Sequence, residues 1–318
     1  IEFGSRARRP NPAAQTLKQK YGDCKDQALL LHQLLSAVEV KSQLTLVNTD
    51  WRTHPSLPTL DQFNHMVVHV PCLGAGRLVD TTDSRLQLEK WQADSLWHSH
   101  ALVLDAEKTH LLPPQATPAA GSCLVESRRT VRPSGEGGWE VRETFTTHGY
   151  YASWFRGAFQ GLDKPQILRK AQSLMENHGR LQVQEARFDT LEDNSLPAVL
   201  ELRYIVPDAI HAEDAGHRGM LPSFWEHDYL ASAFVKDRRT PFVFHYPFQL
   251  RSTVTFEGMP ASFGPALAAR AANRKGTHAS HEWRVSTATP SSPVIEFEFT
   301  VKPGSHPAAE YTRWHEEW

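Results

Sequence analysis

Residues 21–35 read YGDCKDQALLLHQLL, and this stretch decides the fold of the first part of the chain. Leucine and alanine recur at helical spacing on either side of the YGD segment, which interrupts the pattern. The pattern predicts a short helix, a break, and a second helix over residues 24–37. Asp23 or Gly22 can cap the second helix, which places Cys24 in its first turn.

Three short runs rich in valine, leucine and threonine follow the helical stretch. They read KSQLTLVNT at 41–49, HMVVHVP at 65–71 and GRLVDTT at 76–82, and each favours a β-strand. A turn-like CLGAG segment separates the last two runs, as in a hairpin. A helix followed by antiparallel strands predicts an α+β fold for this region.

A stretch rich in proline and alanine, PPQATPAAG at 113–121, resembles a linker and divides the chain. We expect a first domain at residues 6–112 and a mainly antiparallel β domain at residues 120–318. Alternating apolar and polar residues predict the strands of the second domain, arranged as a sandwich or as a curved sheet. The same domain carries helical patterns at 150–161, at 164–178 and from about residue 307.

The 318 residues are 40% hydrophobic and 22% charged, with 34 basic and 36 acidic side chains that are well mixed along the chain. A formal net charge of -2 without a basic stripe argues against a nucleic-acid partner. No apolar run approaches the roughly 20 residues that span a bilayer. The opening IEFGS resembles the remainder of a cloning site, so we expect the chain to be a fragment of a longer protein.

Cys24 is the candidate nucleophile among the three cysteines. A lone cysteine near a helix is more often a small core residue. In the first turn of a helix, however, unsatisfied backbone N–H groups and the positive end of the helix dipole both favour the thiolate. The polar neighbours of Cys24 predict an accessible thiol, whereas Cys72 lies in a turn and Cys123 begins a strand. We interpret Asp26 as a first-turn carboxylate and Lys25 as its solvated neighbour.

A nucleophilic thiol needs an imidazole to pair with and a carboxylate to orient that imidazole. His65 opens one predicted strand and Asp80 ends the next one. His69 is an alternative base because it shares the strand face of His65. A hairpin turn centred near residue 74 or 75 places Asp80 opposite His69, and a turn centred nearer 72 or 73 places it opposite His65. The strand pattern alone does not choose between the two histidines.

The sequence gives weaker signals for an oxyanion hole and for a metal site. The backbone N–H of Cys24 is a natural oxyanion donor, and Gln19 and Tyr21 are candidates for a second donor. The motifs HAEDAGH at 211–217 and HASH at 278–281 hold potential metal ligands. A metal site needs three or four converging ligands, and these two stretches resemble polar loops. We therefore expect neither a metal nor another cofactor.

The segments YGDCKDQALLLHQLL, LVNT, FNHMVVHVP and LVDTTDS together resemble the papain-like core of bacterial transglutaminase-like superfamily proteins, whose motifs are close to GDCKD, FNHV and LDPTD. The resemblance implies a triad of Cys24 as nucleophile, His65 as base and Asp80 as orienting acid. Thr81 stands where the family has proline. RRTPFVFHYPFQLRSTVTFEGMP and PAAEYTRW resemble the β-rich domain that often follows this core, and the resemblance implies a further β domain upstream.

The resemblance also implies a cysteine-dependent acyl-transfer enzyme that acts on an amide bond of a protein, a peptide or a small amide through a thioester. Water as acceptor gives a protease or amidase, and an amine gives a transglutaminase-like acyltransferase. Members are often bacterial and exported, so a periplasmic or exported location is expected. The alternative is a binding or assembly module with a vestigial triad, because a fold alone does not establish activity.

Overall fold

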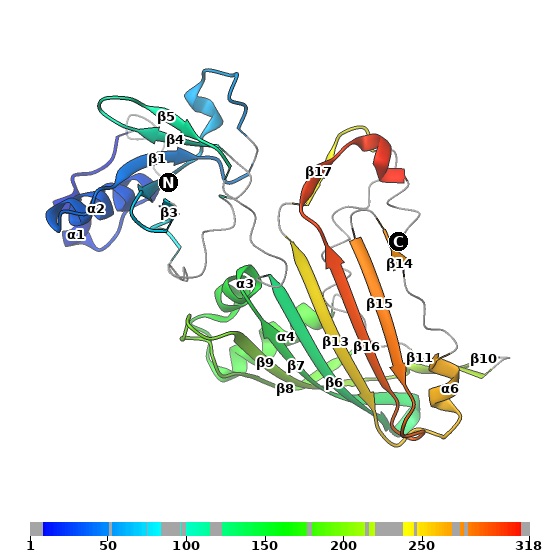
Figure 1. The fold of residues 1–318 in the computed structure, drawn as a ribbon. Coiled ribbons are helices and arrows are strands. Elements are labelled where there is room, and N and C mark those ends of the chain that lie inside the picture. Colours follow the sequence, from blue (N-terminus) through cyan, green and yellow to red (C-terminus); the bar gives the residue numbers. More distant parts are fainter. Residues whose placement is uncertain are drawn as a thin grey trace. The chain divides into compact units, whose positions relative to one another are not determined.

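The structure is a computed structural model of the 318-residue chain. The chain divides into two compact units, Ile1–Thr117 and Pro118–Trp318, which are drawn in Figure 1. The described residues are 9–50, 53–74, 76–83, 96, 100–114, 123–176, 180–213, 216–219, 238–244, 247–268, 274–276 and 279–312.

The first unit is a five-stranded antiparallel sheet with two helices, which confirms an α+β architecture (Figure 1). The strand order is β3-β2-β1-β4-β5. The second helix begins and ends where the sequence predicts, at residues 24 and 37. The elements are α1 (Ala13–Gln19), α2 (Cys24–Ala37), β1 (Gln43–Val47), a 3-10 turn η1 (Leu60–Gln62), β2 (His65–Val70), β3 (Arg77–Val79), β4 (Ala101–Leu104) and β5 (His110–Leu112).

Alternation along β2 separates two apolar layers of the small sheet. Val68 and Val70 pack with Ala28 of α2 on one face, together with the partly buried Met66. Val67 packs on the other face in a second cluster, whose members are Val47, Val67, Leu78, Leu96 and Ala101. Because side chains of a strand point alternately to opposite faces, α2 covers the face of Met66, Val68 and Val70.

Strands β4 and β5 were missed in the sequence, where residues 85–112 show no clear pattern. The run ALVL at 101–104 has the composition of a strand, but three residues of β5 are too few to show a period. β4 pairs with β1, so this hairpin extends the sheet on the side opposite β3. Pairing between strands far apart in sequence therefore completes the first unit.

The β2–β3 hairpin closes through two glycines with left-handed backbone. Gly74 has φ 62° and Gly76 has φ 89°. A Cβ on Gly76 would lie 2.9 Å from Nε2 of His69, whereas a Cβ on Gly74 would have Nε of Arg77 at 3.6 Å as its nearest neighbour. Both positions thus need glycine for their φ, and Gly76 also needs it for space.

We expect Gly76→Ala to destabilise the first unit by at least about 1 kcal/mol more than Gly74→Ala, which itself costs about 1 kcal/mol through its positive φ. The difference arises because the His69 ring is held by Gln43 and cannot move away freely. Urea unfolding of the first unit, followed by hydrogen exchange of β2 peptides, measures both losses. Equal losses for the two variants would contradict a steric role of His69.

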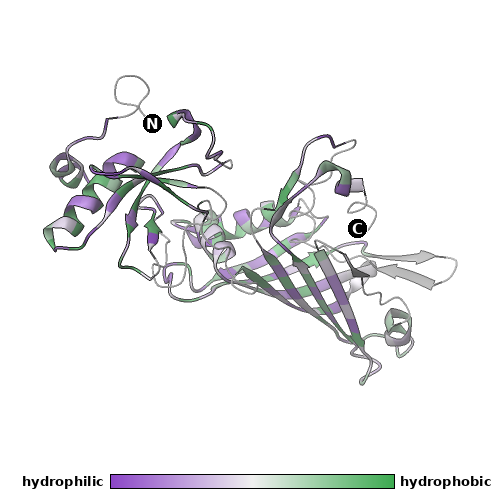
Figure 2. Cartoon of the chain, turned by 45° about the horizontal axis from the view of Figure 1, so that its top comes forward, coloured by the Kyte–Doolittle hydropathy of each residue, from purple (hydrophilic) through white to green (hydrophobic). Residues whose placement is uncertain are grey.

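The second unit is built on one eight-stranded sheet with the order β14-β15-β16-β13-β6-β7-β9-β8. Its strands are β6 (Leu124–Ser134), β7 (Gly138–Thr147), β8 (Gln182–Phe188), β9 (Ala198–Val206), β13 (Phe248–Phe256), β14 (Arg274–Lys275), β15 (Ala279–Ser286) and β16 (Val294–Val301). The helices α3 (Tyr150–Phe159) and α4 (Lys164–Glu176) lie between β7 and β8 in sequence and confirm the two predicted helical segments. Figure 2 shows hydrophilic and hydrophobic residues alternating along the strands of this sheet.

Three expectations for the second unit need correction or restriction. Most of its described strands lie in one eight-stranded sheet, and the rest form the two-stranded sheets β10-β11 and β12-β17, so the described strands do not form a sandwich. β13 pairs with β6 in parallel, although the sequence suggested antiparallel strands throughout, because period-2 alternation is the same in both kinds of pairing. Near the end of the chain the structure shows a 3-10 turn, Ala308–Glu310, followed by two helical residues, and the remainder of the predicted helix lies outside the described residues.

Smaller elements complete the described part of the second unit. They are a 3-10 turn η3 (Gly135–Gly137), β10 (Ile210–Glu213), β11 (Gly216–Gly219), β12 (Phe242–Phe244), α6 (Phe263–Ala268) and β17 (Gly304–His306). In the portions of the chain that the structure describes, no helix has both the length and the apolar character to cross a membrane.

A buried polar cluster crosses β6, β7 and β9. Oε1 of Glu143 accepts hydrogen bonds from Oγ of Ser127 at 2.6 Å and from Nε of Arg129 at 2.7 Å. Oε2 of Glu143 accepts from the Tyr204 hydroxyl at 2.7 Å. Burial, and next the Glu143 charge, raise the pKa of Tyr204 well above its usual value, which keeps it a neutral donor. Both carboxylate oxygens are therefore satisfied inside the unit.

Candidate active site

The start of α2 places Cys24 as its first helical residue. Asp23 is the N-cap, and its side chain accepts a hydrogen bond from the backbone N–H of Asp26. The Asp26 side chain accepts in return from the backbone N–H of Asp23, which closes a capping box. The cap fixes where the helix begins and thus holds Cys24 at its positive end.

The residues around Cys24 also join α1 to α2. Asp26 is buried and accepts from the backbone N of Asn11 at 2.6 Å and from its Nδ2 at 3.0 Å. A Cβ on Gly22 would lie 2.7 Å from Cβ of Asp26 and 3.0 Å from Cγ2 of Thr16, so glycine permits this close approach. The prediction of a solvated Lys25 was wrong, because its side chain is buried and pairs with Asp23.

Cys24, His65 and Asp80 are joined by hydrogen bonds. Nε2 of His65 lies 2.9 Å from Oδ2 of Asp80. Cys24 and His65 are close enough to shift each other's pKa, and the backbone N–H of Met66 also lowers the pKa of Cys24. The imidazole therefore interacts with both a thiol and a carboxylate.

The electrostatics of these groups favour a thiolate and an imidazolium. The hydrogen bond with His65 lowers the pKa of Cys24, against an opposing effect of burial. Burial tends to lower the pKa of His65, but the hydrogen bonds and charges of Asp80 and Cys24 outweigh it and raise that pKa to about 9. Burial opposes ionisation of Asp80 too, yet His65 and Thr82 hold its pKa below the usual value. Both shifts favour an ion pair between the sulfur and the imidazole over the neutral pair.

The observed register of the β2–β3 hairpin matches neither of the two turn positions that the sequence analysis considered for His65 and His69. His69 faces Leu78 and Val68 faces Val79, so the turn is centred between residues 73 and 74. The next pair would place Asp80 opposite Val67, diagonal to both histidines on the same face. Neither of the two turn centres considered is the observed one, and Asp80 reaches His65 along a diagonal.

His69 has a different set of neighbours. Its Nδ1 lies 3.1 Å from Oε1 of Gln43 on the adjacent strand β1, and its ring covers Gly76. Burial, with a smaller contribution from the charge of His110, lowers the pKa of His69. His69 is thus a buried and preferentially neutral residue that packs within the sheet.

Two contributors to the site were not identified from the sequence. Thr82 donates to Oδ1 of Asp80 from its backbone N at 2.9 Å and from its hydroxyl at 2.7 Å. An aspartate followed two residues later by threonine is a common local turn, so the segment DTT carried a usable signal for this contact. The N–H of Met66 had no such signal, because a backbone donor is independent of residue type.

The remaining candidate residues are the two proposed oxyanion donors and the two other cysteines. Gln19 ends α1 and is exposed, and Tyr21 is also exposed. No hydrogen bond from either side chain to Cys24 is seen in the described structure, so their role as oxyanion donors stays a prediction. Cys72 is exposed and Cys123 is buried. Of the three thiols, Cys24 alone is half-buried at a helix start.

Among the described residues, no group of three or more histidine, cysteine, aspartate or glutamate side chains is arranged to hold a metal. The motifs at 211–217 and 278–281 fall partly outside the described residues. Where it is described, the first of them forms the strands β10 and β11.

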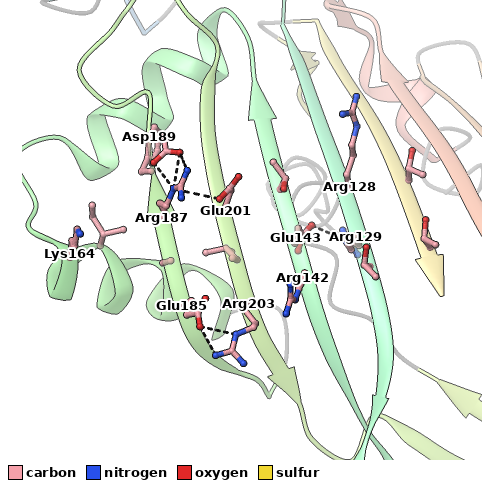
Figure 3. A pocket seen from close by; sticks show the side chains of 18 residues that line it. Arg128, Arg129, Arg142, Glu143, Lys164, Glu185, Arg187, Asp189, Glu201 and Arg203 are labelled. Atoms are coloured by element: carbon pink, nitrogen blue, oxygen red, sulfur yellow. Dashed lines mark hydrogen bonds and ion pairs between the residues drawn. The ribbon is translucent and has the colours of Figure 1, made fainter. Parts of the chain in front are cut away.

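A large charged groove of 1190 Å³ lies on the sheet of the second unit (Figure 3). Arg203 pairs with Glu185, and Arg187 pairs with Asp189 and Glu201. Its lining contains neither a cysteine nor a histidine. The groove therefore matches the water-facing side of the sheet and offers no thiol–imidazole pair.

No protein-family model matches the chain, and no curated protein matches it. Among solved structures, the chain is similar to a crystal structure from Parabacteroides distasonis described as a "putative protease", with 11% sequence identity and a TM-score of 0.47. The likeness covers 96% of this chain and 42% of the other protein, so that protein extends well beyond the shared region.

Proposed function

We propose that the chain is a cysteine-dependent acyl-transfer enzyme that acts on amide bonds, with a transglutaminase-like core in its first unit. Cys24 is the nucleophile, His65 the acid and base, and Asp80 the residue that orients His65. The observation that carries the proposal is the 2.9 Å contact between Nε2 of His65 and Oδ2 of Asp80, together with the interaction of His65 with Cys24 at the start of α2. Such an arrangement activates a thiol and fixes the tautomer of its partner imidazole.

The residues support a two-step reaction. The Cys24 thiolate forms a bond to the carbonyl carbon, and the oxyanion that develops lies near the helix start, where the Cys24 N–H is a donor. The His65 imidazolium gives its proton to the leaving amine as the C–N bond breaks, and a thioester remains. His65 then takes a proton from water or from an acceptor amine, which attacks the thioester and releases Cys24 as thiolate.

The acceptor in the second step defines the subclass. Water gives a protease or amidase, and an amine gives a transglutaminase-like acyltransferase. Both subclasses share the first step and its residues, so a test of the thioester applies to each of them. The extent to which the site excludes water determines whether water or an amine attacks the thioester.

Thioester formation is the direct test. Incubation with p-nitrophenyl acetate should acetylate Cys24 and release one nitrophenol per site in a burst, because the paired thiolate attacks faster than the thioester turns over. Intact-mass analysis should show an adduct that hydroxylamine removes. Cys24→Ser should lose this adduct, whereas Cys72→Ser, which alters an exposed thiol, should keep it.

Two results would overturn the proposal. One is an adduct that forms in Cys24→Ser at the rate of the unmodified chain. The other is acetylation spread over several residues without preference for Cys24. Either result would favour the alternative of a binding module that retains the three residues without activity.

A further inference from the structure

The first unit, which carries the proposed site, also contains an apolar hollow. Its volume is 200 Å³, and its lining comes from the segment 53–63, from His100 and from the strands β4 and β5. No aspartate, glutamate, lysine or arginine contributes to the lining. The larger side chains of the lining include Leu57, Leu60, Phe63, His100, Leu102 and Leu111.

Strand pairing connects this hollow to Cys24 in a straight row. Met66 on β2 faces Leu46 on β1, Leu46 also faces Leu102 on β4, and Leu102 faces Leu111 on β5. Residues that face each other in a sheet point to the same side, so all four lie on the side that α2 covers at β2. None of the four is fully buried, and Leu111 is exposed. The row is therefore an apolar strip across four strands that becomes exposed at β5.

One end of the row is Met66, which directly follows His65 on β2, and the other end is the hollow. Leu102 and Leu111 form part of that hollow. Neighbouring strands are about 4.8 Å apart, so Leu102 lies roughly 10 Å from Met66. An extended peptide rises about 3.3 Å per residue and covers that distance in about three residues.

Hydrogen bonds brace the wall of the hollow. Gln62 donates from Nε2 to the Leu57 carbonyl at 2.5 Å and accepts at Oε1 from the backbone N of His54 at 2.6 Å. The Gln62 carbonyl in turn accepts from Nδ2 of Asn48 on the sheet side. At the other end of the segment, the Thr53 hydroxyl exchanges hydrogen bonds with the backbone of His100. A braced wall holds the hollow open before a ligand arrives.

Large apolar side chains at the hollow are left in water. The exposed fraction is 53% for Leu57, 52% for Leu60 and 39% for Leu111. Three such leucines around one hollow form a patch of the kind that binds a ligand. A dry cavity of about 150 Å³ holds a benzene ring, so 200 Å³ suits one leucine or phenylalanine side chain.

We propose that this hollow is the specificity pocket of the acyl-transfer site and takes a leucine- or phenylalanine-sized side chain of the acyl part of a polypeptide substrate. The inference rests on the proposed function. The bound side chain lies about three residues from the carbonyl that Cys24 attacks. The acyl part is the suitable occupant because it stays attached through both steps, so its binding energy is available at both barriers.

The test uses N-acetyl tetrapeptide chloromethyl ketones in which one leucine is moved through otherwise glycine positions. The measured quantity is the second-order rate of Cys24 alkylation, followed by peptide mass spectrometry. We expect one position, about three residues from the reactive carbon, to accelerate alkylation at least about tenfold over the all-glycine probe. The other positions should stay close to the all-glycine rate.

A pair of matched variants locates the effect. Leu60→Ser should remove most of the acceleration, whereas Leu17→Ser, which changes a leucine that is 57% exposed on α1, should keep it. Both side chains are largely exposed, so neither change should unfold the unit. Iodoacetamide, which has no side chain to bind, should label Cys24 at the same rate in both variants.

The outcomes separate the two proposals. Selective labelling of Cys24 by iodoacetamide without any dependence on leucine position would overturn the specificity pocket and leave acyl transfer standing. Acceleration that survives Leu60→Ser would place the pocket elsewhere and overturn it too. Iodoacetamide labelling without preference for Cys24 would overturn the acyl-transfer proposal and the pocket together.

Discussion

His65→Ala should slow the alkylation of Cys24 by iodoacetamide at least about tenfold near pH 5.5 and should change the shape of its pH profile. In the unmodified chain, His65 lowers the pKa of Cys24, so a larger share of this thiol is ionised in acid than of an ordinary thiol. As pH rises through about 9, His65 loses its proton and the unpaired thiolate becomes more nucleophilic. The unmodified chain should therefore show two steps, and His65→Ala a single step near the ordinary thiol value of about 8.5.

Two controls make this result specific. His69→Ala removes an imidazole from the same strand face, but that ring contacts Gln43 and should leave the two-step profile intact. Cys72 reports the behaviour of an exposed thiol in the same samples. An unchanged Cys24 profile in His65→Ala, or an equal change in His69→Ala, would contradict the assignment of His65 as the partner of Cys24.

Glu143→Ala should lower the free energy of unfolding of the second unit by about 3–5 kcal/mol, the largest stability effect that we expect in this protein. The change leaves the Arg129 guanidinium buried without its carboxylate and takes the acceptor from Ser127 and Tyr204. Breaking a buried pair from one side costs far more than an exposed pair contributes. Urea unfolding, read by hydrogen exchange of β6 and β7 peptides, measures the loss.

Matched variants distinguish this cluster from a general effect on β7. Glu140→Ala, on the same strand but half-exposed, should cost less than about 1 kcal/mol. Replacing Arg129 and Glu143 together by leucine should recover much of the loss, because the double variant buries neither charge of the pair. Similar losses for Glu140→Ala and Glu143→Ala would show that the buried cluster is not the cause.

Much of the secondary structure follows from local patterns. The cap, the apolar spacing and the polar first turn of the helix over residues 24–37 all depend on residues that are neighbours in sequence. The hairpin of β6 and β7 and the helices α3 and α4 have equally local signals. Short strands such as β5 do not, because three residues cannot display a period.

The candidate site was accessible from sequence only in part. Cys24 at a helix start and Asp80 at a strand end have local reasons to be there, and the resemblance to transglutaminase-like proteins favoured His65. The strand face could not exclude His69, since both histidines share it. The contact that selects His65 depends on a register in which Asp80 faces Val67 and reaches diagonally.

Local patterns thus determine the elements, the helix start that holds Cys24, and the residue types of a thiol site. Tertiary structure decides the partner of Asp80, the parallel pairing of β13 with β6, and the row from Met66 to Leu111. The reason is that propensity and capping act between neighbours in sequence, whereas strand pairing joins residues that the sequence separates by tens of positions. A shift of one residue in register would send each side chain to the other face, so only the folded sheet defines the site and its hollow.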